Sequence, residues 1–220
     1  MSFTRKLLAW YKRNARVLPW RETRNPYAIL VSEFMLQQTQ VSRVLDYYPR
    51  FLKRFPTIDK LARARPKTVR EAWDGMGYYA RAANLHALAK QVAETGYRIP
   101  DDPEDLRTLP GVGRYTAGAV ACFAYEKPVP TVDTNVRRVL TRVFGNAKVG
   151  MRNAELWELA SRLLPKDGKR AWRFNQALME LGALVCTARK PKCPICPLRS
   201  DCLAVRSATR TRNRGPERPR

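Results

Sequence analysis

Apolar side chains recur at intervals of three and four residues along most of this chain. In residues 41–55 the apolar positions are Val41, Val44, Leu45, Tyr48, Phe51, Leu52 and Phe55. The same interval returns in residues 136–143, 156–163 and 174–185. This spacing is typical of amphipathic α-helices, and no segment sustains the alternation of apolar and polar residues that a half-buried strand shows. The pattern therefore predicts an all-α protein.

Proline and glycine residues divide this helical pattern into short pieces. They occur at Pro19, Pro26, Pro56, Pro66, Pro100, Pro103, Pro110, Gly111, Pro128, Pro130 and Pro165. These breaks predict about ten short helices joined by tight loops. The longest run of apolar and small residues, 117–125, has nine residues, and a membrane-spanning helix needs ~20. We therefore expect no membrane association.

The charge of the chain points to a polyanionic partner. Lysine and arginine number 42 against 19 aspartates and glutamates, which gives a formal net charge of +23. Self-repulsion of this size disfavours a compact fold unless a partner offsets it. No basic helix with a broad apolar face stands out, so nucleic acid is favoured over a membrane surface. A basic protein without such a partner is the alternative that charge alone leaves open.

Four of the five cysteines lie within the last 35 residues, at Cys186, Cys193, Cys196 and Cys202. Such clustering in a chain without a disulfide framework indicates a metal site. Four-cysteine zinc sites usually combine two Cys-x2-Cys pairs. One such pair with two single cysteines also fits a cubane iron–sulfur cluster. The spacing alone leaves both metals open.

The loop between the first two of these cysteines is basic. It contains Arg189, Lys190 and Lys192. A loop that is tethered at both ends and carries three cations suits contacts with phosphate groups. A solvated charged loop is the alternative.

Residues 109–117, Leu-Pro-Gly-Val-Gly-Arg-Tyr-Thr-Ala, have the form of a helix-hairpin-helix turn. Gly111 and Gly113 flank Val112, and a segment with a helical pattern that includes Arg114 follows. Glycine permits a phosphate to approach the backbone closely, and the N–H groups at the start of the helix face the anion. We expect this turn to bind the DNA backbone without reading sequence.

Two carboxylates stand near the starts of helical patterns. Glu33 follows an apolar run, 29–31, and Asp133 lies within Thr-Val-Asp-Thr-Asn-Val. Either residue suits the first turn or the cap of a helix, where a negative charge is favourable. For Asp133 the functional alternative is a carboxylate that stabilises positive charge on a sugar.

Two further segments contain side chains suited to DNA bases. The amides of Gln37 and Gln38 can wedge into a duplex and hydrogen-bond base edges. Tyr78 and Tyr79 follow a Gly-Met-Gly segment, and aromatic rings after such a hinge can stack on bases. Half-buried core tyrosines are the structural alternative.

Taken together, these residues make the chain similar to a known family. It resembles the helix-hairpin-helix DNA glycosylases with an iron–sulfur cluster, the endonuclease III superfamily, and most closely the branch that removes mispaired adenine. The resemblance runs from about residue 18 to residue 202 and rests on segments 18–21, 32–41, 77–81, 109–117, 132–136 and 174–179 and on the four cysteines.

The resemblance implies a role for each candidate residue. Glu33 matches the catalytic acid that protonates a ring nitrogen of the extruded base, and Asp133 matches the carboxylate that stabilises an oxocarbenium-like sugar. Asn135 matches a residue near the scissile sugar. Gln37, Gln38 and Tyr78 match residues that fill the gap and touch the opposite base. The four cysteines match the ligands of a 4Fe-4S cluster.

Tyr115 occupies the position at which the lyases of this superfamily have a lysine. A lysine there forms a Schiff base with the sugar, which tyrosine cannot do. The resemblance therefore implies a monofunctional glycosylase that leaves an abasic site. Tyrosine also occurs in thymine glycosylases, and adenine glycosylases usually add a C-terminal domain that recognises 8-oxoguanine, whereas this chain ends in an Arg-rich tail. Thymine or uracil opposite guanine therefore stays an alternative substrate, as does a lesion-binding protein without catalysis.

The resemblance also implies an architecture. We expect a two-lobed helix-hairpin-helix glycosylase fold, with a six-helix lobe over residues 25–135 and a cluster lobe formed by residues 1–24 and 136–202. Residues 203–220 are expected to form a basic disordered tail. Duplex DNA with a mismatched or damaged base would bind in the cleft between the lobes, where Glu33 and Asp133 would converge. We expect a monomer located in the cytoplasm and associated with the nucleoid.

Overall fold

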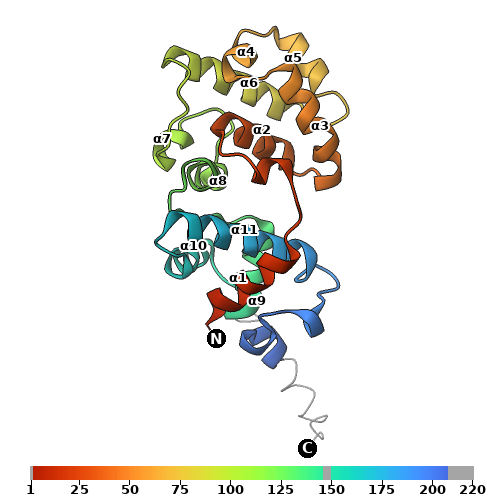
Figure 1. Cartoon of the computed structure of the whole chain (residues 1–220), viewed down its shortest axis with the longest axis vertical. Coiled ribbons are helices and arrows are strands. Elements are labelled where there is room, and N and C mark those ends of the chain that lie inside the picture. Colours follow the sequence, from red (N-terminus) through yellow and green to blue (C-terminus); the bar gives the residue numbers. More distant parts are fainter. Residues whose placement is uncertain (1, 146–149, 208–220) are drawn as a thin grey trace, which may run out of the picture. The chain divides into compact units, whose positions relative to one another are not determined.

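The computed structural model describes residues 2–145 and 150–207 of the chain, and its regular structure is helical (Figure 1). The α-helices are α1 (Phe3–Asn14), α2 (Pro26–Leu36), α3 (Val41–Arg54), α4 (Ile58–Ala62), α5 (Pro66–Ala72), α6 (Ala80–Glu94), α7 (Pro103–Arg107), α8 (Arg114–Tyr125), α9 (Thr134–Phe144), α10 (Asn153–Leu163) and α11 (Gly168–Leu184). Short 3-10 helices occur at η1 (Pro19–Arg21), η2 (Cys193–Ile195) and η3 (Arg199–Asp201). No extended strand occurs within the described residues, which confirms the all-α prediction.

The chain forms two compact units. The middle unit is Val17–Lys127, and the terminal unit combines Met1–Arg16 with Pro128–Arg220. These boundaries differ from the predicted lobes, which change at residues 24/25 and 135/136. With the observed boundaries Asp133 belongs to the terminal unit, whereas Glu33 belongs to the middle unit.

Helix α2 is the central helix of the middle unit. Every residue from Tyr27 to Met35 is buried, and α3, α6 and α8 pack against it. A helix that is apolar on all sides is stable only when it is covered on all sides. Asn25 begins the helix by accepting a hydrogen bond from the Ala28 N–H at 3.0 Å, and Pro26 occupies its first position. This arrangement carries Glu33 into the interior.

Helix α3 covers α2 with the face that the apolar pattern predicts. Val44, Tyr48 and Phe51 are buried, whereas Leu45 is 38% exposed. The Phe51 ring meets the Trp73 ring edge to face, with 5.7 Å between the ring centroids. The predicted face is therefore confirmed for the residues that form its centre.

Helices α9 and α11 form the core of the terminal unit, and α1 packs against α11 while α10 packs against α9. The apolar positions that the sequence predicts are buried on both central helices: Val136, Val139, Leu140 and Val143 on α9, and Phe174, Leu178 and Leu181 on α11. Gly182 permits the two backbones to approach, because a Cβ atom there would lie 2.6 Å from the Asn135 Cβ atom. The start of α9 is therefore held directly against α11.

The segment predicted to be a disordered tail, residues 203–220, starts with ordered residues. Residues 203–207 are helical, and Ala204 and Val205 pack against the core of the terminal unit. The core thus covers these two apolar residues, whereas the neighbouring Arg206 is exposed. The remainder of the tail, residues 208–220, lies outside the described residues.

A buried ion pair joins the N-terminal segment to α11. The Arg16 side chain donates to both Glu180 carboxylate oxygens, with Nε to Oε1 at 2.8 Å and Nη2 to Oε2 at 2.9 Å. The Arg16 backbone N–H adds a bond to Oε1 at 2.9 Å. The Glu180 side chain has no exposed surface, and that of Arg16 is 35% exposed. A carboxylate this deeply buried requires its partner, because desolvation without compensation is costly.

Replacing Arg16 by methionine should destabilise the protein. The variant leaves the Glu180 carboxylate buried without its paired charge, and we expect a loss of about 2–3 kcal/mol in the free energy of unfolding, after allowance for the partial exposure of Arg16. Urea denaturation followed by circular dichroism measures this loss. Arg13→Met, at an exposed position in the last turn of α1, is the matched control and should change stability by less than about 0.5 kcal/mol. Equal stability of the two variants would contradict the assigned role of the pair.

Candidate functional site

The helix-hairpin-helix turn has the conformation that its glycines predict. It joins α7 to α8, and Gly111 has φ +75°. A Cβ atom at Gly111 would lie 2.9 Å from both the Asn84 Cβ and the Phe34 Cε1 atoms, so a larger residue would have to displace α2 and α6 side chains. Val112 is buried and anchors the turn, while Gly113 and Arg114 are exposed. The turn therefore presents backbone N–H groups and one cation to solvent at the start of α8.

Glu33 lies deep inside the middle unit. Helix α2 begins at Pro26, so Glu33 is in the second half of the helix, and the alternative that it is a first-turn acid is wrong. Glu33 is 5% exposed and is flanked along α2 by buried residues. Placing a carboxyl group in such surroundings costs folding free energy, and groups of this kind concentrate at functional sites.

The loops that follow α2 and precede α6 carry the amide and aromatic candidates. Gln37 is the C-cap of α2, and Gln38 is exposed with φ +54°. Tyr78 has φ +48° and is 62% exposed. A positive φ at a residue other than glycine stores strain and is uncommon outside turns and functional sites. The structure therefore holds Gln38 and Tyr78 in defined, exposed conformations.

Tyr79 is placed differently from Tyr78. The Arg70 guanidinium lies over its ring, 4.9 Å from the ring centroid, and its hydroxyl donates to the Asp74 carboxylate. Both partners come from the segment that includes α5. The Tyr79 side chain is therefore held by contacts within its own unit, and Tyr78 is the more exposed of the two rings.

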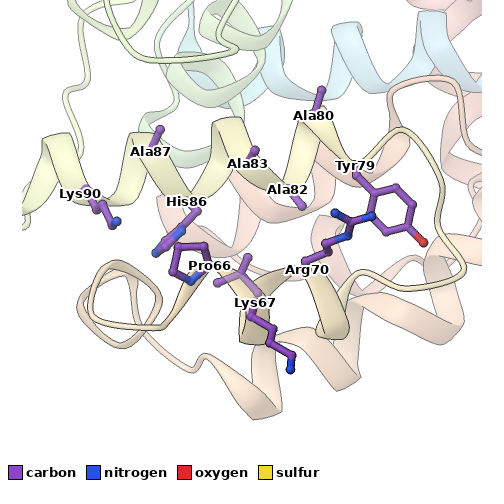
Figure 2. Close-up of a pocket in the computed structure, with 11 residues that line it drawn as sticks. Pro66, Lys67, Arg70, Tyr79, Ala80, Ala82, Ala83, His86, Ala87 and Lys90 are labelled. Carbon is purple, nitrogen blue, oxygen red and sulfur yellow. The ribbon is translucent and has the colours of Figure 1, made fainter.

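A basic pocket lies between α5 and α6 beside Tyr79 (Figure 2). Its volume is about 710 Å³, its cations are Lys67, Arg70 and Lys90, and none of the described residues that line it is acidic. His86 forms part of the wall, is 5% exposed and has a lowered pKa, chiefly because burial disfavours the charged imidazole. His86 is therefore a buried part of the pocket wall.

Asp133 caps α9 and holds a second polar group. Its Oδ1 atom accepts from the Val136 N–H at 2.7 Å, and its Oδ2 atom accepts from Asn135 Nδ2 at 2.8 Å. The capping alternative from the sequence is therefore correct as a description of the structure. Burial raises the pKa of Asp133, and the hydrogen bonds from Val136 and Asn135 oppose that shift. On acidification this carboxylate gains its proton earlier than an exposed aspartate does.

Side chains from α9 and α11 hold the segment around Asp133. Arg138 donates from Nη2 to Asn135 Oδ1 at 2.6 Å and from Nε to the Cys186 carbonyl at 2.6 Å. An unbroken chain of hydrogen bonds thus runs from the backbone of the cysteine loop to the Asp133 carboxylate. Asn175 on α11 accepts from the Thr131 N–H at 3.3 Å and donates to the Val129 carbonyl at 2.9 Å. These contacts explain the use of an asparagine within the 174–179 motif.

The four clustered cysteines line one cavity of about 520 Å³ in the terminal unit. No group of three or more His, Cys, Asp or Glu side chains among the described residues is arranged closely enough for a single metal ion. A cubane cluster has its irons at separate corners, so its thiolates stand further apart than the ligands of one ion. Burial first, and then the neighbouring cysteines, raise the pKa of Cys196 to about 11. A cationic group between these sulfurs would offset that cost, so the residues fit an iron–sulfur cluster.

Arg142 ties α9 to the loop that carries these cysteines. It donates to the Thr187 carbonyl at 2.7 Å, to the Ala188 carbonyl at 2.8 Å and to the Cys186 sulfur at 3.4 Å. The loop residues Arg189, Lys190 and Lys192 are exposed. Arg142 therefore fixes the backbone of the loop and leaves its three cations facing solvent.

Tyr115 and Cys122 both lie on α8. Tyr115 is in the first turn and half-buried. Cys122 is fully buried between apolar neighbours of the same helix, as expected for a core thiol.

The sequence did not single out the arginines that organise these segments. Arg81, Arg138 and Arg142 each donate to several backbone carbonyls. In the sequence they are three of 42 basic residues, and helical spacing does not distinguish a buried arginine from a solvated one.

Two segments of the chain match known protein families. Residues 31–162 match the family described as HhH-GPD superfamily base excision DNA repair protein. Residues 186–202 match the iron–sulfur binding domain of endonuclease III, and this segment begins and ends at the outer two of the four cysteines. The cofactor of the chain is accordingly a 4Fe-4S cluster.

Individual relatives are similar over nearly the whole chain. An adenine DNA glycosylase of Mycobacterium tuberculosis is 50% identical over 96% of the chain, and the human adenine DNA glycosylase is 44% identical over 92%. The solved structure of a thermostable thymine-DNA glycosylase superposes with a TM-score of 0.86 at 33% identity and covers 93% of the chain. The match covers 70% of the mycobacterial protein, 39% of the human protein and 95% of the thymine-DNA glycosylase.

Replacing Cys196 by alanine should remove the cluster. The variant lacks one thiolate of the cavity, so we expect loss of bound iron and sulfide and of the visible absorbance that they give. Chemical iron analysis and an absorbance spectrum measure both quantities. Cys122→Ala is the matched control, since this thiol lies within α8 in the other unit and should leave the iron content unchanged. Retention of iron by the Cys196 variant would contradict the proposed ligand set.

Proposed function

The chain belongs to the HhH-GPD superfamily of base excision DNA repair proteins, and from this premise we propose that it removes mispaired adenine from duplex DNA. The reaction is hydrolysis of the bond between the base and its deoxyribose. Support comes from relatives described as adenine DNA glycosylases at 44–50% identity. The observation in the structure that carries the proposal is the carboxyl group of Glu33, which is buried in the second half of α2, away from the first turn of that helix.

Two carboxyl groups divide the chemistry. Glu33 is the general acid that protonates a ring nitrogen of the extruded adenine, which turns the base into a better leaving group. Asp133 is the carboxylate that stabilises the positive charge developing on the sugar. Its two hydrogen bonds, from Val136 and Asn135, fix its orientation. A water molecule then adds to the sugar carbon and leaves an abasic site. Raising the pKa of Asp133 by burial restricts its charged form to less acidic solutions.

The base must leave the helix before this reaction, since its reacting atoms are inaccessible within the stack. We assign Gln37, Gln38 and Tyr78 to the gap and to the opposite base. The exposed ring of Tyr78 suits stacking between bases, and the amides suit hydrogen bonds to base edges.

Phosphate contacts hold the duplex during extrusion. We assign them to Gly111, Val112, Gly113 and Arg114 in the hairpin and to Arg189, Lys190 and Lys192 in the cysteine loop. The exposure of these cations and the net charge of +23 support the assignment. On this proposal DNA with a mismatched base is the partner of a monomer that works at the nucleoid. Within the described residues no helix could cross a membrane.

Cys186, Cys193, Cys196 and Cys202 are proposed as the cluster ligands. When bound, the cluster supplies a rigid covalent support for the cysteine loop. The chain's own contribution is Arg142, which holds the loop backbone, and Arg138, which connects that backbone to Asn135 and so to Asp133.

A second candidate activity is removal of thymine opposite guanine. It is favoured by the thymine-DNA glycosylase structure, of which the match covers 95%. The lower identity to that protein, 33% against 50% for the mycobacterial adenine enzyme, makes adenine the first proposal.

One panel of duplexes tests both the identity of the released base and the role of Glu33 as the general acid. We expect base release from A·G and A·8-oxoguanine duplexes and none from T·G or U·G duplexes, measured by alkaline strand cleavage in single-turnover reactions. Glu33→Gln should slow release about 10²–10⁴-fold, because the amide cannot donate the proton. Glu94→Gln, an exposed residue at the end of α6, is the matched control and should keep the full rate.

The outcomes of this panel separate the alternatives. Release of thymine without adenine would overturn the adenine proposal in favour of the second candidate. Tight binding of all mismatches without release of any base would indicate a lesion-binding protein.

The product should be an intact strand with an abasic site. Tyr115 has no amine with which to form a Schiff base, so borohydride should trap no covalent complex with DNA. Gel electrophoresis of the trapping reaction measures this result, with a lysine-dependent lyase of the superfamily as the positive control. Trapping well above background would contradict the assignment of a monofunctional enzyme.

A further inference from the structure

One buried arginine contacts both loops that carry the proposed base-reading residues. Arg81 lies at the start of α6 in the middle unit and is 7% exposed. Its terminal nitrogens donate to acceptors in residues 34–39 and in residues 76–77. The first segment ends α2 and includes Gln37 and Gln38, and the second directly precedes Tyr78. All of these contacts lie within a single unit.

The first set of contacts closes the end of α2. The Nη1 atom lies 3.1 Å from the Phe34 carbonyl and 2.9 Å from the Met35 carbonyl, and it also contacts the Gln37 carbonyl. The Thr39 hydroxyl accepts from the same nitrogen at 3.0 Å. The last carbonyls of a helix lack intrahelical partners and carry partial negative charge. A guanidinium at this point satisfies them and turns the chain out of the helix.

The second set of contacts holds the turn before α6. The Nη2 atom donates to the Met76 carbonyl at 3.2 Å and to the Gly77 carbonyl at 3.1 Å. The indole N–H of Trp73 donates to the same Gly77 carbonyl at 3.3 Å. The guanidinium carbon lies 5.4 Å from the centroid of the Tyr78 ring and 5.5 Å from that of Trp73. Arg81 thus contacts both the backbone of this turn and the exposed ring.

Each of the two loops contains a residue with a positive φ angle other than glycine, Gln38 at +54° and Tyr78 at +48°. Such conformations persist only where the surrounding structure fixes them. Arg81 contacts residues on the N-terminal side of both positions, and Thr39 on the far side of Gln38. The planar fork of a guanidinium can reach both loops at once, which the single point charge of lysine cannot do.

We propose that Arg81 is a positioning residue that joins these two loops into one rigid element for opening a mispaired duplex. The proposal rests on the function assigned above. Arg81 acts through the loops and not on the base itself. Its loss should therefore impair extrusion of the target base, and the impairment should depend on Tyr78.

A double-mutant cycle tests this dependence. We expect Arg81→Lys and Tyr78→Ala each to slow single-turnover release of adenine from an A·G duplex by about 10–100-fold. If Arg81 acts through the Tyr78 loop, the double variant should be little slower than the slower single variant. Arg50→Lys, at an exposed position of α3 in the same unit, is the matched control and should keep the full rate. Losses that multiply in the double variant would overturn the proposal.

Fluorescence of 2-aminopurine separates positioning from a general loss of structure. The probe replaces the target adenine opposite guanine, and its emission rises when the base leaves the stack. Measured in a Glu33→Gln background, Arg81→Lys should reduce this rise at saturating protein. A full rise combined with slow release would contradict the proposal.

A milder variant covers the case in which Arg81→Lys fails to fold. Thr39→Val removes one side-chain acceptor of Arg81 and keeps the backbone contacts. We expect a smaller reduction of the fluorescence rise, with an unchanged thermal unfolding midpoint. An unchanged fluorescence rise in a folded Thr39→Val protein would count against the proposal.

Base release and probe fluorescence of the wild-type protein separate a failure of this proposal from a failure of the proposed function. If it releases thymine from T·G and no adenine, the adenine assignment fails while the same cycle can be run on T·G. If it releases no base, the fluorescence of the extruded probe still reports on Arg81. Absence of any probe extrusion by the wild-type protein would overturn both proposals.

Discussion

Multiple hydrogen bonds from arginine side chains to backbone carbonyls hold the irregular segments of this protein in place. Arg81 closes the end of α2 and the turn before α6, and Arg138 and Arg142 bind the cysteine loop to α9. Loops between short helices have few apolar contacts of their own, so their carbonyls need donors from elsewhere. A guanidinium supplies five N–H groups in a fixed plane. The proposed base-reading residues and the cysteine loop both depend on this interaction.

The same residue type serves two opposite purposes in this chain. Exposed cations such as Arg189 and Lys190 face solvent and suit phosphate contacts. Half-buried or buried arginines such as Arg16 and Arg81 give up water and donate instead to several protein acceptors. The net charge of +23 thus combines a DNA-binding surface with internal structural supports. Lysine suits the first purpose, whereas its single ammonium group cannot serve the second.

The two proposed catalytic carboxyl groups occupy different environments. Glu33 is carried into the interior by a helix that is apolar on every side. Asp133 stands at the start of α9, where burial raises its pKa and backbone and side-chain hydrogen bonds oppose that shift. Such a difference is what allows one carboxyl group to donate a proton while another stays ionised. Asp133 is both a helix cap and the proposed catalytic carboxylate. The two roles are compatible, because the helix that a cap residue begins holds its carboxylate rigidly.

The sequence by itself determined the helical class, the buried faces of α3, α9 and α11, the hairpin glycines and the cysteine cluster, because these depend on short-range spacing and on residue chemistry. Spacing did not decide between a first-turn position for Glu33 and an interior one, since the start of α2 is fixed by the Asn25 cap and by packing on all its sides. Nor did it distinguish Arg81, Arg138 and Arg142 from other basic residues, because their acceptors lie up to 48 positions away in the chain. Only the tertiary structure brings those carbonyls to the guanidinium groups, and it thereby decides which arginines are structural and which face solvent.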